Sequence, residues 1–254
     1  MRAALLGLAS LTVACGSAPR AAAGIPARPS AVPRNGLEVI GAMRRAHPSR
    51  QLRSLSLAVD IFDNDSTRVG RARMYAQLPG RLRVETLPAS RQSGYVRQRQ
   101  QVAVFERGRR VTRVDRVDLA ALVAYDVFAQ SIDTTIMWLD SARVRFGLTR
   151  LDELDGREVW VVGALEGDLT SSQFWVDARE WRVLRVIQRE PWNGNQLVDT
   201  RFTEFTTVRD VPVPQRVAMY RGGRLVQRQH ISVTKVNPRV SPRAFDLTRW
   251  SSVD

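Results

Sequence analysis

The sequence predicts a mainly β domain with a few helices (class α+β), built on an antiparallel sheet. Hydrophobic residues alternate with period two in one segment after another over most of the chain, which is typical of strands. Helical spacing occurs only near the start and in the middle, so the strand–helix alternation of a parallel sheet is missing. Turn dipeptides separate several of the strand segments: Pro79-Gly80, Asp155-Gly156, Asn193-Gly194 and Gly222-Gly223.

The first half of the domain begins with one helix. It follows Asn35-Gly36 and ends near Pro48, and its apolar residues recur at helical spacing. Strands are then predicted over residues 55–61, 71–78, 82–85, 95–99, 102–106 and 110–114.

The strand after Pro79-Gly80 shows a clear alternation of residue types. Leu82 and Val84 continue the apolar face of the preceding strand. We expect the opposite face to be polar, and it carries Arg81, Arg83 and Glu85.

The alternation stops between Asp118 and Ala142. Leu119, Leu122, Val123 and Val127 recur at helical spacing, as do Ile136 and Leu139. We therefore predict two short helices, the second capped by Asp133.

Strands resume after this insertion and continue almost to the end of the chain. They are predicted over residues 144–151, 158–165, 173–176, 181–187, 198–207, 216–220 and 225–236. The total is about eleven or twelve strands in sequence-adjacent order.

Several of these strands are apolar on both faces. Val159 and Val161 alternate with Trp160 and Val162, so neither face of that strand is polar. A sheet with one face in water alternates cleanly, and two apolar faces therefore require a cover on each side. Helices inside a curved sheet, a closed barrel, or an interior that holds an apolar ligand would each supply that cover.

The N-terminus has the pattern of an export signal. Arg2 precedes a stretch rich in Ala, Leu and Gly that reaches Ala14, too short to cross a bilayer, and Cys15 follows as the only cysteine of the chain. This order resembles a bacterial lipobox, although Thr12 stands where that pattern prefers Leu. The alternative is an ordinary signal peptide with a chance cysteine. On the lipobox interpretation, residues 1–14 are a signal peptide, and Cys15 is acylated, for instance with palmitate.

Residues 15–34 are rich in Ala, Pro, Gly, Ser and Arg, and have no means of forming a core. We expect them to be a tether of roughly 50–60 Å when extended. Residues 35–254 then form the folded domain. Gly16 after Cys15 is not the aspartate that marks retention at the inner membrane, so we expect the outer membrane.

The net charge of +14 comes almost entirely from arginine, since Lys235 is the only lysine. The arginines are spread along the chain instead of being clustered, so we expect no nucleic-acid partner. A basic surface beside anionic lipid head groups and a solvated surface without a partner are both compatible with this pattern.

Candidates for chemistry are few. His47 and His230 are the only histidines, and neither lies in a metal-ligand or catalytic spacing. Asp60, Asp63 and Asp65 lack the pattern of a calcium loop and are better explained as turn residues. We therefore expect no enzyme activity, no metal and no cofactor.

Several segments carry a resemblance to a known family: Ala76-Gln77-Leu78-Pro79-Gly80-Arg81-Leu82-Arg83-Val84-Glu85, Leu154-Asp155-Gly156-Arg157-Glu158-Val159-Trp160, Phe174-Trp175-Val176-Asp177, Val213-Pro214, and the end from Val236-Asn237-Pro238 to Ala244-Phe245-Asp246. With these segments in this order, the chain resembles the LolA/LolB-like lipoprotein-localisation superfamily. The resemblance covers about residues 36 to 248. It implies an unclosed antiparallel β-barrel, here of about eleven strands, with the mid-chain helices as a lid over an apolar interior that binds acyl chains.

For this chain the resemblance implies that the second mid-chain helix forms the inner face of the lid. The expected ligand-binding residues are Leu122, Ile136, Met137, Trp138, Leu139, Trp160 and Trp175. An ordinary helix packed on a sheet would show the same pattern. Leu87 stands near the loop in which membrane-anchored relatives carry an exposed apolar residue for delivery to the bilayer; the alternative is a leucine folded back on the sheet edge.

These expectations combine into one functional hypothesis. The protein would be exported to the cell envelope, held at the periplasmic face of the outer membrane by its lipid anchor, and monomeric. It would bind acyl chains of lipoproteins or other lipids for sorting or transfer. The alternative is an envelope lipid or stress sensor, or an interaction module, on the same fold.

Overall fold

The computed structural model describes residues 32–48, 51–190, 195–251 and 253. The expected signal peptide, Cys15 and most of the expected tether lie outside this part of the chain. Among the described helices, none is long and apolar enough to cross a membrane.

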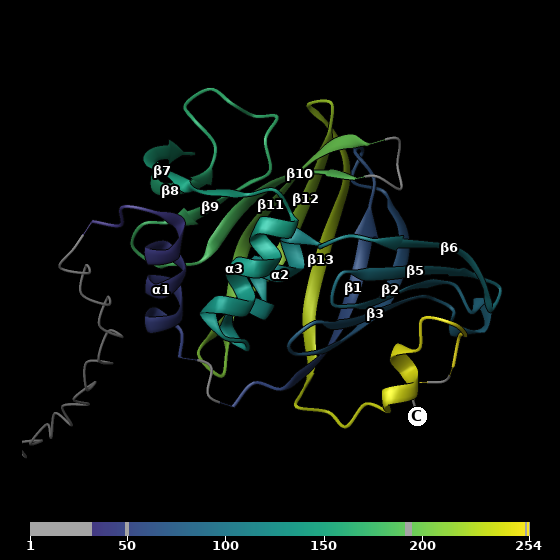
Figure 1. Ribbon diagram of the computed structural model, residues 1–254. Helices are drawn as coiled ribbons and strands as arrows, with labels where there is room; N and C mark the ends of the chain where they lie inside the picture. The colour runs from purple at the N-terminus through teal and green to yellow at the C-terminus, as the bar shows by residue number, and fades with distance from the viewer. Residues whose placement is uncertain (1–31, 49–50, 191–194, 252, 254) are drawn as a thin grey trace, which may run out of the picture.

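A single curved antiparallel sheet forms the body of the domain (Figure 1). Its 13 strands follow the order β6-β5-β4-β3-β2-β1-β13-β12-β11-β10-β9-β8-β7. The strands are β1 Ser54–Phe62, β2 Arg68–Gln77, β3 Arg81–Thr86, β4 Gly94–Gln98, β5 Gln101–Glu106, β6 Arg109–Asp115, β7 Arg145–Leu154, β8 Arg157–Gly163, β9 Gln173–Asp177, β10 Val183–Glu190, β11 Gln196–Val208, β12 Val211–Arg221 and β13 Arg224–Val236.

The first and last strands pair with each other in the middle of the sheet. Leu57 of β1 lies opposite Val233 of β13, so two meanders, β1–β6 and β7–β13, are joined edge to edge. Strands β6 and β7 stand at the two free edges and do not pair, so the barrel is unclosed. The predicted fold class is confirmed, with 13 strands instead of about eleven.

Helix α1 (Gly36–Ala46) packs at the edge of the second meander. The side chain of Asn35 caps it by accepting a hydrogen bond from the Glu38 amide. A Cβ on Gly36 would come within 2.5 Å of Val162 Cγ1, so the glycine allows the helix to approach β7 and β8 closely.

The mid-chain insertion consists of α2 (Leu119–Ala124), a short 3₁₀ turn η2 (Asp126–Phe128) and α3 (Ile132–Ser141). We call residues 118–142 the lid. Asp118 caps α2, and Ser131 caps α3 by accepting from the Thr134 amide. The prediction that Asp133 caps this helix is wrong by two residues. Asp133 lies in the first turn of α3, where its negative charge interacts favourably with the positive end of the helix dipole.

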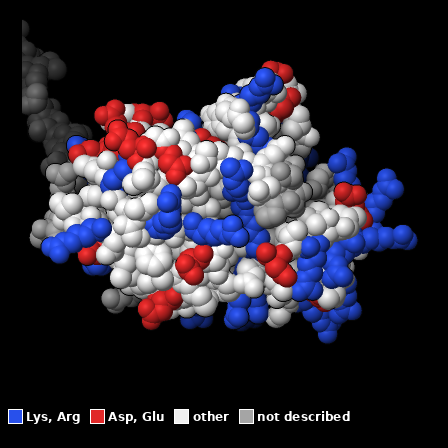
Figure 2. Space-filling model, turned by 45° about the horizontal axis from the view of Figure 1, so that its top comes forward, with Lys and Arg blue, Asp and Glu red and all other residues white. Residues whose placement is uncertain are grey.

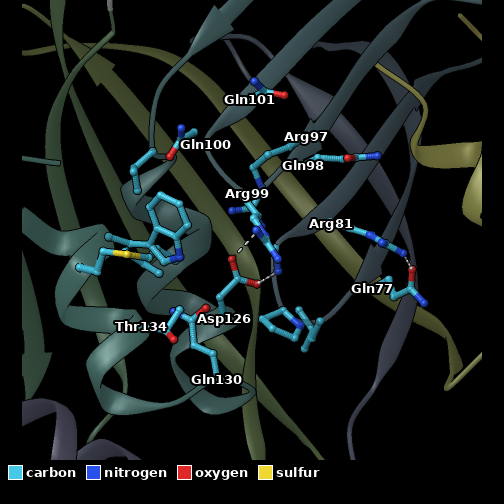
Figure 3. A pocket seen from close by; sticks show the side chains of 17 residues that line it. Gln77, Arg81, Arg97, Gln98, Arg99, Gln100, Gln101, Asp126, Gln130 and Thr134 are labelled. Atoms are coloured by element: carbon cyan, nitrogen blue, oxygen red, sulfur yellow. Dashed lines mark hydrogen bonds and ion pairs between the residues drawn. The ribbon is translucent and has the colours of Figure 1, made fainter. Parts of the chain in front are cut away.

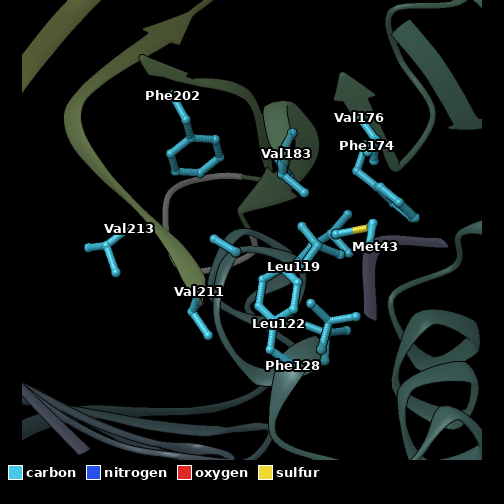
Figure 4. Packing of buried hydrophobic residues seen from close by; sticks show 14 of the residues in the cluster. Met43, Leu119, Leu122, Phe128, Phe174, Val176, Val183, Phe202, Val211 and Val213 are labelled. Atoms are coloured by element: carbon cyan, nitrogen blue, oxygen red, sulfur yellow. The ribbon is translucent and has the colours of Figure 1, made fainter. Parts of the chain in front are cut away.

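The apolar side of the lid packs against the concave face of the sheet. Leu119, Val123, Val127 and Leu139 are completely buried there, together with Met43 of α1. Figure 4 shows Leu119, Leu122 and Phe128 beside Met43, with Phe174, Val183 and Phe202 on the strands nearby. The interior of the half-barrel is therefore occupied by the chain's own side chains.

Part of the convex face is covered by the C-terminal segment. Ala244 and Phe245, in the 3₁₀ turn η4 (Pro242–Phe245), are completely buried against β4 and β5 (Figure 1). The predicted polar face of β3 is therefore covered at Arg83 and Glu85, which are both buried. Arg83 is completely buried, donates to Glu85 Oε1 and to the Ala244 carbonyl, and lies 3.8 Å from the ring of Trp250.

The two apolar faces of β8 belong to two separate clusters of buried residues. Trp160 and Val162 belong to the main core on the concave side. Val159 and Val161 lie on the other side in a second cluster with Trp175.

Candidate functional site

A cavity of about 960 Å³ lies beside the lid. It lies between α3, the turn from β2 to β3, and the turn from β4 to β5 (Figure 3). Its apolar lining includes Val117, Leu122, Met137 and Trp138. Most of the remaining lining is polar: Gln77, Arg81, Arg97, Gln98, Arg99, Gln100, Gln101, Asp126, Gln130 and Thr134.

Asp126 joins the lid to the sheet at the bottom of this cavity. Its Oδ2 lies 3.0 Å from Arg97 Nη2, and its Oδ1 accepts a hydrogen bond from the Gly80 amide at 2.8 Å. Arg97 and Asp126 are 3% and 2% exposed, so this ion pair is shielded from water. A buried pair of this kind holds its geometry, because either charge without the other would be strongly unfavourable.

The electrostatics around Arg97 follow from its burial. Burial alone lowers the pKa of an arginine, but the carboxylates of Asp126 and Asp118 outweigh it, and the pKa of Arg97 is raised. Burial, followed by the charge of Asp118, raises the pKa of both Tyr95 and Tyr125. Arg97 is therefore a permanent cation, and the two tyrosines remain neutral hydroxyls.

The two turns that border the cavity are connected to each other. The Arg99 amide donates to the Gly80 carbonyl at 2.6 Å, and Gly80 has the positive φ of +84° that glycine adopts without strain. A chain of hydrogen bonds thus runs from Asp126 of the lid through Gly80 in one turn to Arg99 in the other.

The opposite side of the lid is held by α1. Arg44 donates through Nη1 to the carbonyl of Val127 at 3.0 Å and also to the carbonyl of Gln130. The lid therefore has polar attachments at three separate places: Arg97 and Gly80 on the first meander, Arg44 on α1, and Gln188 of β10, whose Oε1 accepts a hydrogen bond from the Leu119 amide at 2.9 Å.

The residues expected to bind an acyl chain are not all in one place. Leu122, Met137 and Trp138 line the cavity, and Met137 is half exposed. Leu139 is completely buried in the core below α3, and Trp160 is in the same core. Ile136 is partly buried but is not part of the cavity lining.

Trp175 lies on the convex side of the sheet. Its indole N–H donates to Gln173 Oε1, and Arg185 stacks at 4.6 Å from its ring. Leu87 is partly buried just after β3, and its amide donates to the Arg71 carbonyl. Strand alternation alone did not show which face of the sheet is concave.

Sequence reasoning missed Arg44, Arg97 and Asp126. A signal for Asp126 was available, since it is the one carboxylate between Leu119 and Phe128 in an otherwise apolar stretch. Its partner Arg97 is 29 residues away and looks like any other arginine of a strand.

Neither a protein-family model nor a curated protein sequence matches this chain. Solved structures do resemble it. A LolA-superfamily protein from Nitrosomonas europaea matches with a TM-score of 0.50 and 14% identity, covering 85% of this chain and 98% of that one. A putative outer-membrane lipoprotein-sorting protein domain from Vibrio parahaemolyticus matches with a TM-score of 0.50 and 10% identity, covering 83% and 96%. The chain therefore has a LolA/LolB-like fold, as its sequence predicted.

Proposed function

We propose that this protein is a lipid-anchored envelope protein that binds acyl chains or lipoproteins inside its half-barrel, for sorting or transfer. One observation carries the proposal: a lid with an apolar inner side covers the concave face of an unclosed sheet, and a few polar contacts attach it at three places. The names of the two similar structures place this fold among LolA-superfamily and lipoprotein-sorting proteins.

The interior has the chemistry that an acyl chain needs. Leu122, Val123, Phe128 and Leu139 of the lid are buried against strands rich in Val, Leu and Phe. If the lid moves outward, an acyl chain takes the place of these side chains and contributes about 0.8 kcal/mol for each buried CH₂. Contacts between the lid side chains and the strands are thereby exchanged for contacts between the acyl chain and the strands, which favours reversible binding.

The polar attachments favour the closed state without a ligand. Displacing the lid separates Asp126 from Arg97 and from the Gly80 amide, and separates Arg44 from two carbonyls. These groups regain hydrogen bonds with water when the lid opens, so the net cost of opening is modest. The apolar interior is thus hidden until cargo arrives.

We propose a binding role and not a catalytic one. Both histidines have structural contacts: His47 ends α1 and bonds the carbonyls of Glu180 and Asp210, and the ring of His230 lies 4.3 Å from that of Phe62. Asp63 accepts from the amides of Asp65 and Thr67, as a turn residue does.

The location follows from the N-terminal segment in this proposal. Acylated Cys15 and the Pro-rich tether would hold the domain at the periplasmic face of the outer membrane. Figure 2 shows basic side chains over much of one face and most densely at its right side, with carboxylates gathered at its upper left, which is compatible with a surface that approaches anionic head groups.

The direct test is native mass spectrometry of the protein after gentle extraction from membranes, with lipid extraction in parallel. We expect an acyl-bearing molecule bound at one per chain, and its loss after delipidation with recovery on adding lipoprotein. Repeated absence of any bound acyl chain, with no uptake on addition, would contradict the proposal.

A sensor or interaction module is the second candidate. The edge strand β6 favours it, because six of its seven residues are exposed and its outer backbone groups are free to pair with an extended segment of a partner. Isolation from membranes separates the two: a stable signalling partner supports the sensor, and transient lipoprotein cargo supports the carrier.

A further inference from the structure

The cavity beside the lid differs in chemistry from the apolar interior. Three arginines line it, Arg81, Arg97 and Arg99, against the single carboxylate of Asp126. Five glutamines surround them: Gln77, Gln98, Gln100, Gln101 and Gln130. Amide and guanidinium groups at this density would be poor neighbours for an acyl chain, because they would lose water without gaining hydrogen bonds.

The charge of the cavity is not neutralised by its own residues. Both oxygens of Asp126 are already used by Arg97 and the Gly80 amide. Arg81 donates only to the neutral Gln77 Oε1, and the side chain of Arg99 has no partner among the residues that the structure describes. Two cationic side chains therefore border this cavity without a counter-charge.

Both sides of the cavity contribute apolar residues. Leu122, Met137 and Trp138 come from α2 and α3 of the lid, and Leu78 and Pro79 come from the turn between β2 and β3. The cationic side chains come from the sheet side, where Arg81 begins β3 and Arg99 lies between β4 and β5 (Figure 3). Met and Trp adapt to irregular apolar groups. The cavity thus offers cationic groups on its sheet side and, on its lid side, apolar groups that lie next to the core.

We propose that this cavity binds the phosphate-bearing head group of an amphiphile, with Arg81 and Arg99 pairing with the phosphate and the acyl chain passing along α3 toward the interior. The inference rests on the proposed function, because it requires that the interior accepts the chain. Guanidinium groups suit a phosphate because they donate two parallel, charge-assisted hydrogen bonds. Glutamines beside them supply partners for the hydroxyl groups of a glycerol-type head group. The volume of about 960 Å³ lies in the range of small-molecule sites.

The test compares two amphiphiles with the same acyl chain, lysophosphatidylglycerol and the phosphate-free monoacylglycerol, titrated into the delipidated full-length protein below the concentrations at which they aggregate. We expect the phosphate-bearing lysolipid to bind at least about tenfold more tightly, since one charge-assisted contact is enough for that ratio. The double variant Arg81→Gln and Arg99→Gln should weaken binding of lysophosphatidylglycerol until the two affinities come together. A matched control, Arg109→Gln and Arg113→Gln on the exposed edge strand β6, removes the same charge outside the cavity and should keep the preference.

Each of the other possible outcomes overturns a specific part of the proposal. Equal affinity for lysophosphatidylglycerol and monoacylglycerol in the wild type, or a preference that survives in the Arg81/Arg99 variant, overturns the head-group site but not acyl binding. Failure of both amphiphiles to bind overturns the proposed function itself. If glycerol phosphate displaces bound lysophosphatidylglycerol as strongly as unlabelled lysophosphatidylglycerol does, the ligand is a free phosphate ester and the proposal of an amphiphile is overturned.

Discussion

Asp126 of the lid and Arg97 of β4 form an ion pair, with Nη2 and Oδ2 3.0 Å apart and both side chains at most 4% exposed. Nε of the same arginine is buried and has no hydrogen-bond partner among the described residues. The charge of Arg97 is thus satisfied mainly by this one contact, whereas Asp126 also accepts a hydrogen bond from the Gly80 amide. The attachments of the lid supply the first two predictions below.

Replacing Asp126 by Asn should destabilise the protein by about 3–5 kcal/mol, because it leaves the Arg97 charge buried without a partner. The Asn side chain still offers an oxygen to the Gly80 amide, so the change isolates the charge. Urea unfolding measures the loss. Asp152→Asn is the control: it removes the partner of Arg150 in a pair that is 21% and 32% exposed, and we expect less than about 1 kcal/mol. Similar losses in the two variants would contradict the role of Asp126.

Replacing Arg44 by Gln should loosen the lid from α1. It removes the hydrogen bonds to the Val127 and Gln130 carbonyls, which together contribute about 1–3 kcal/mol. Amide hydrogen exchange over residues 119–141 should become faster, and acyl binding should tighten, because the open state becomes more populated. Arg45→Gln, on the exposed side of the same helix, should change neither. Unchanged exchange in the Arg44 variant would show that α1 does not hold the lid.

Replacing Trp250 by Ala should destabilise the first meander by about 2–4 kcal/mol, since the indole covers the buried Arg83 and packs 5.4 Å from the ring of Phe105. Denaturant unfolding followed by circular dichroism measures this. Arg249→Ala, at a side chain that is 69% exposed, should stay within about 0.5 kcal/mol of the wild type. If both variants behave alike, the C-terminal segment does not contribute to the core.

Stability at acid pH should depend on Asp168 in the loop between β8 and β9. The hydroxyl of Ser171, the amides of Thr170 and Ser171 and the hydroxyl of Thr170 donate to its carboxylate and lower its pKa below the ordinary value. A lowered folded pKa means that the contribution is complete above the unfolded value of about 3.9 and is lost as the pH falls through the folded value. Asp168→Asn should therefore reduce stability at pH 7 and flatten its decline below about pH 4.

Urea unfolding at a series of pH values checks this. Asp155→Asn, which removes an exposed carboxylate in the turn between β7 and β8, should preserve the acid decline of the wild type. An unchanged pH profile in Asp168→Asn would exclude the loop as its source.

Replacing Cys15 by Ser should release the protein from the membrane fraction and leave its unfolding transition unchanged, because the proposed anchor is separate from the folded domain. Fractionation and urea unfolding measure the two effects. A variant that stays in the membrane fraction would remove the main support for the lipid anchor.

The strand and helix pattern could be predicted from the sequence because each element depends on local periodicity. Every segment predicted as a strand overlaps a strand of the sheet, and both lid helices occur where the spacing indicated them. The cap of α3 was misplaced because Ser131 and Asp133 are both good capping residues, and only the backbone decides which of them precedes the first turn.

The site could not be predicted in the same way. Trp160 and Trp175 look equivalent in the sequence, yet the pairing of β8 with β9 places them on opposite faces of the sheet. Arg83 looks like a solvated strand residue, yet a segment more than 150 residues later covers it.

The sequence by itself determined an antiparallel sheet, a helical insertion in its middle and the candidate anchor at Cys15, since these follow from residue spacing and short motifs. Only the tertiary structure decided which arginines are buried, which carboxylate holds the lid and that the cavity beside the lid is polar. The physical reason is that the burial and pairing of a charged side chain depend on what the rest of the chain brings against it, and for Arg97 that partner is 29 residues away.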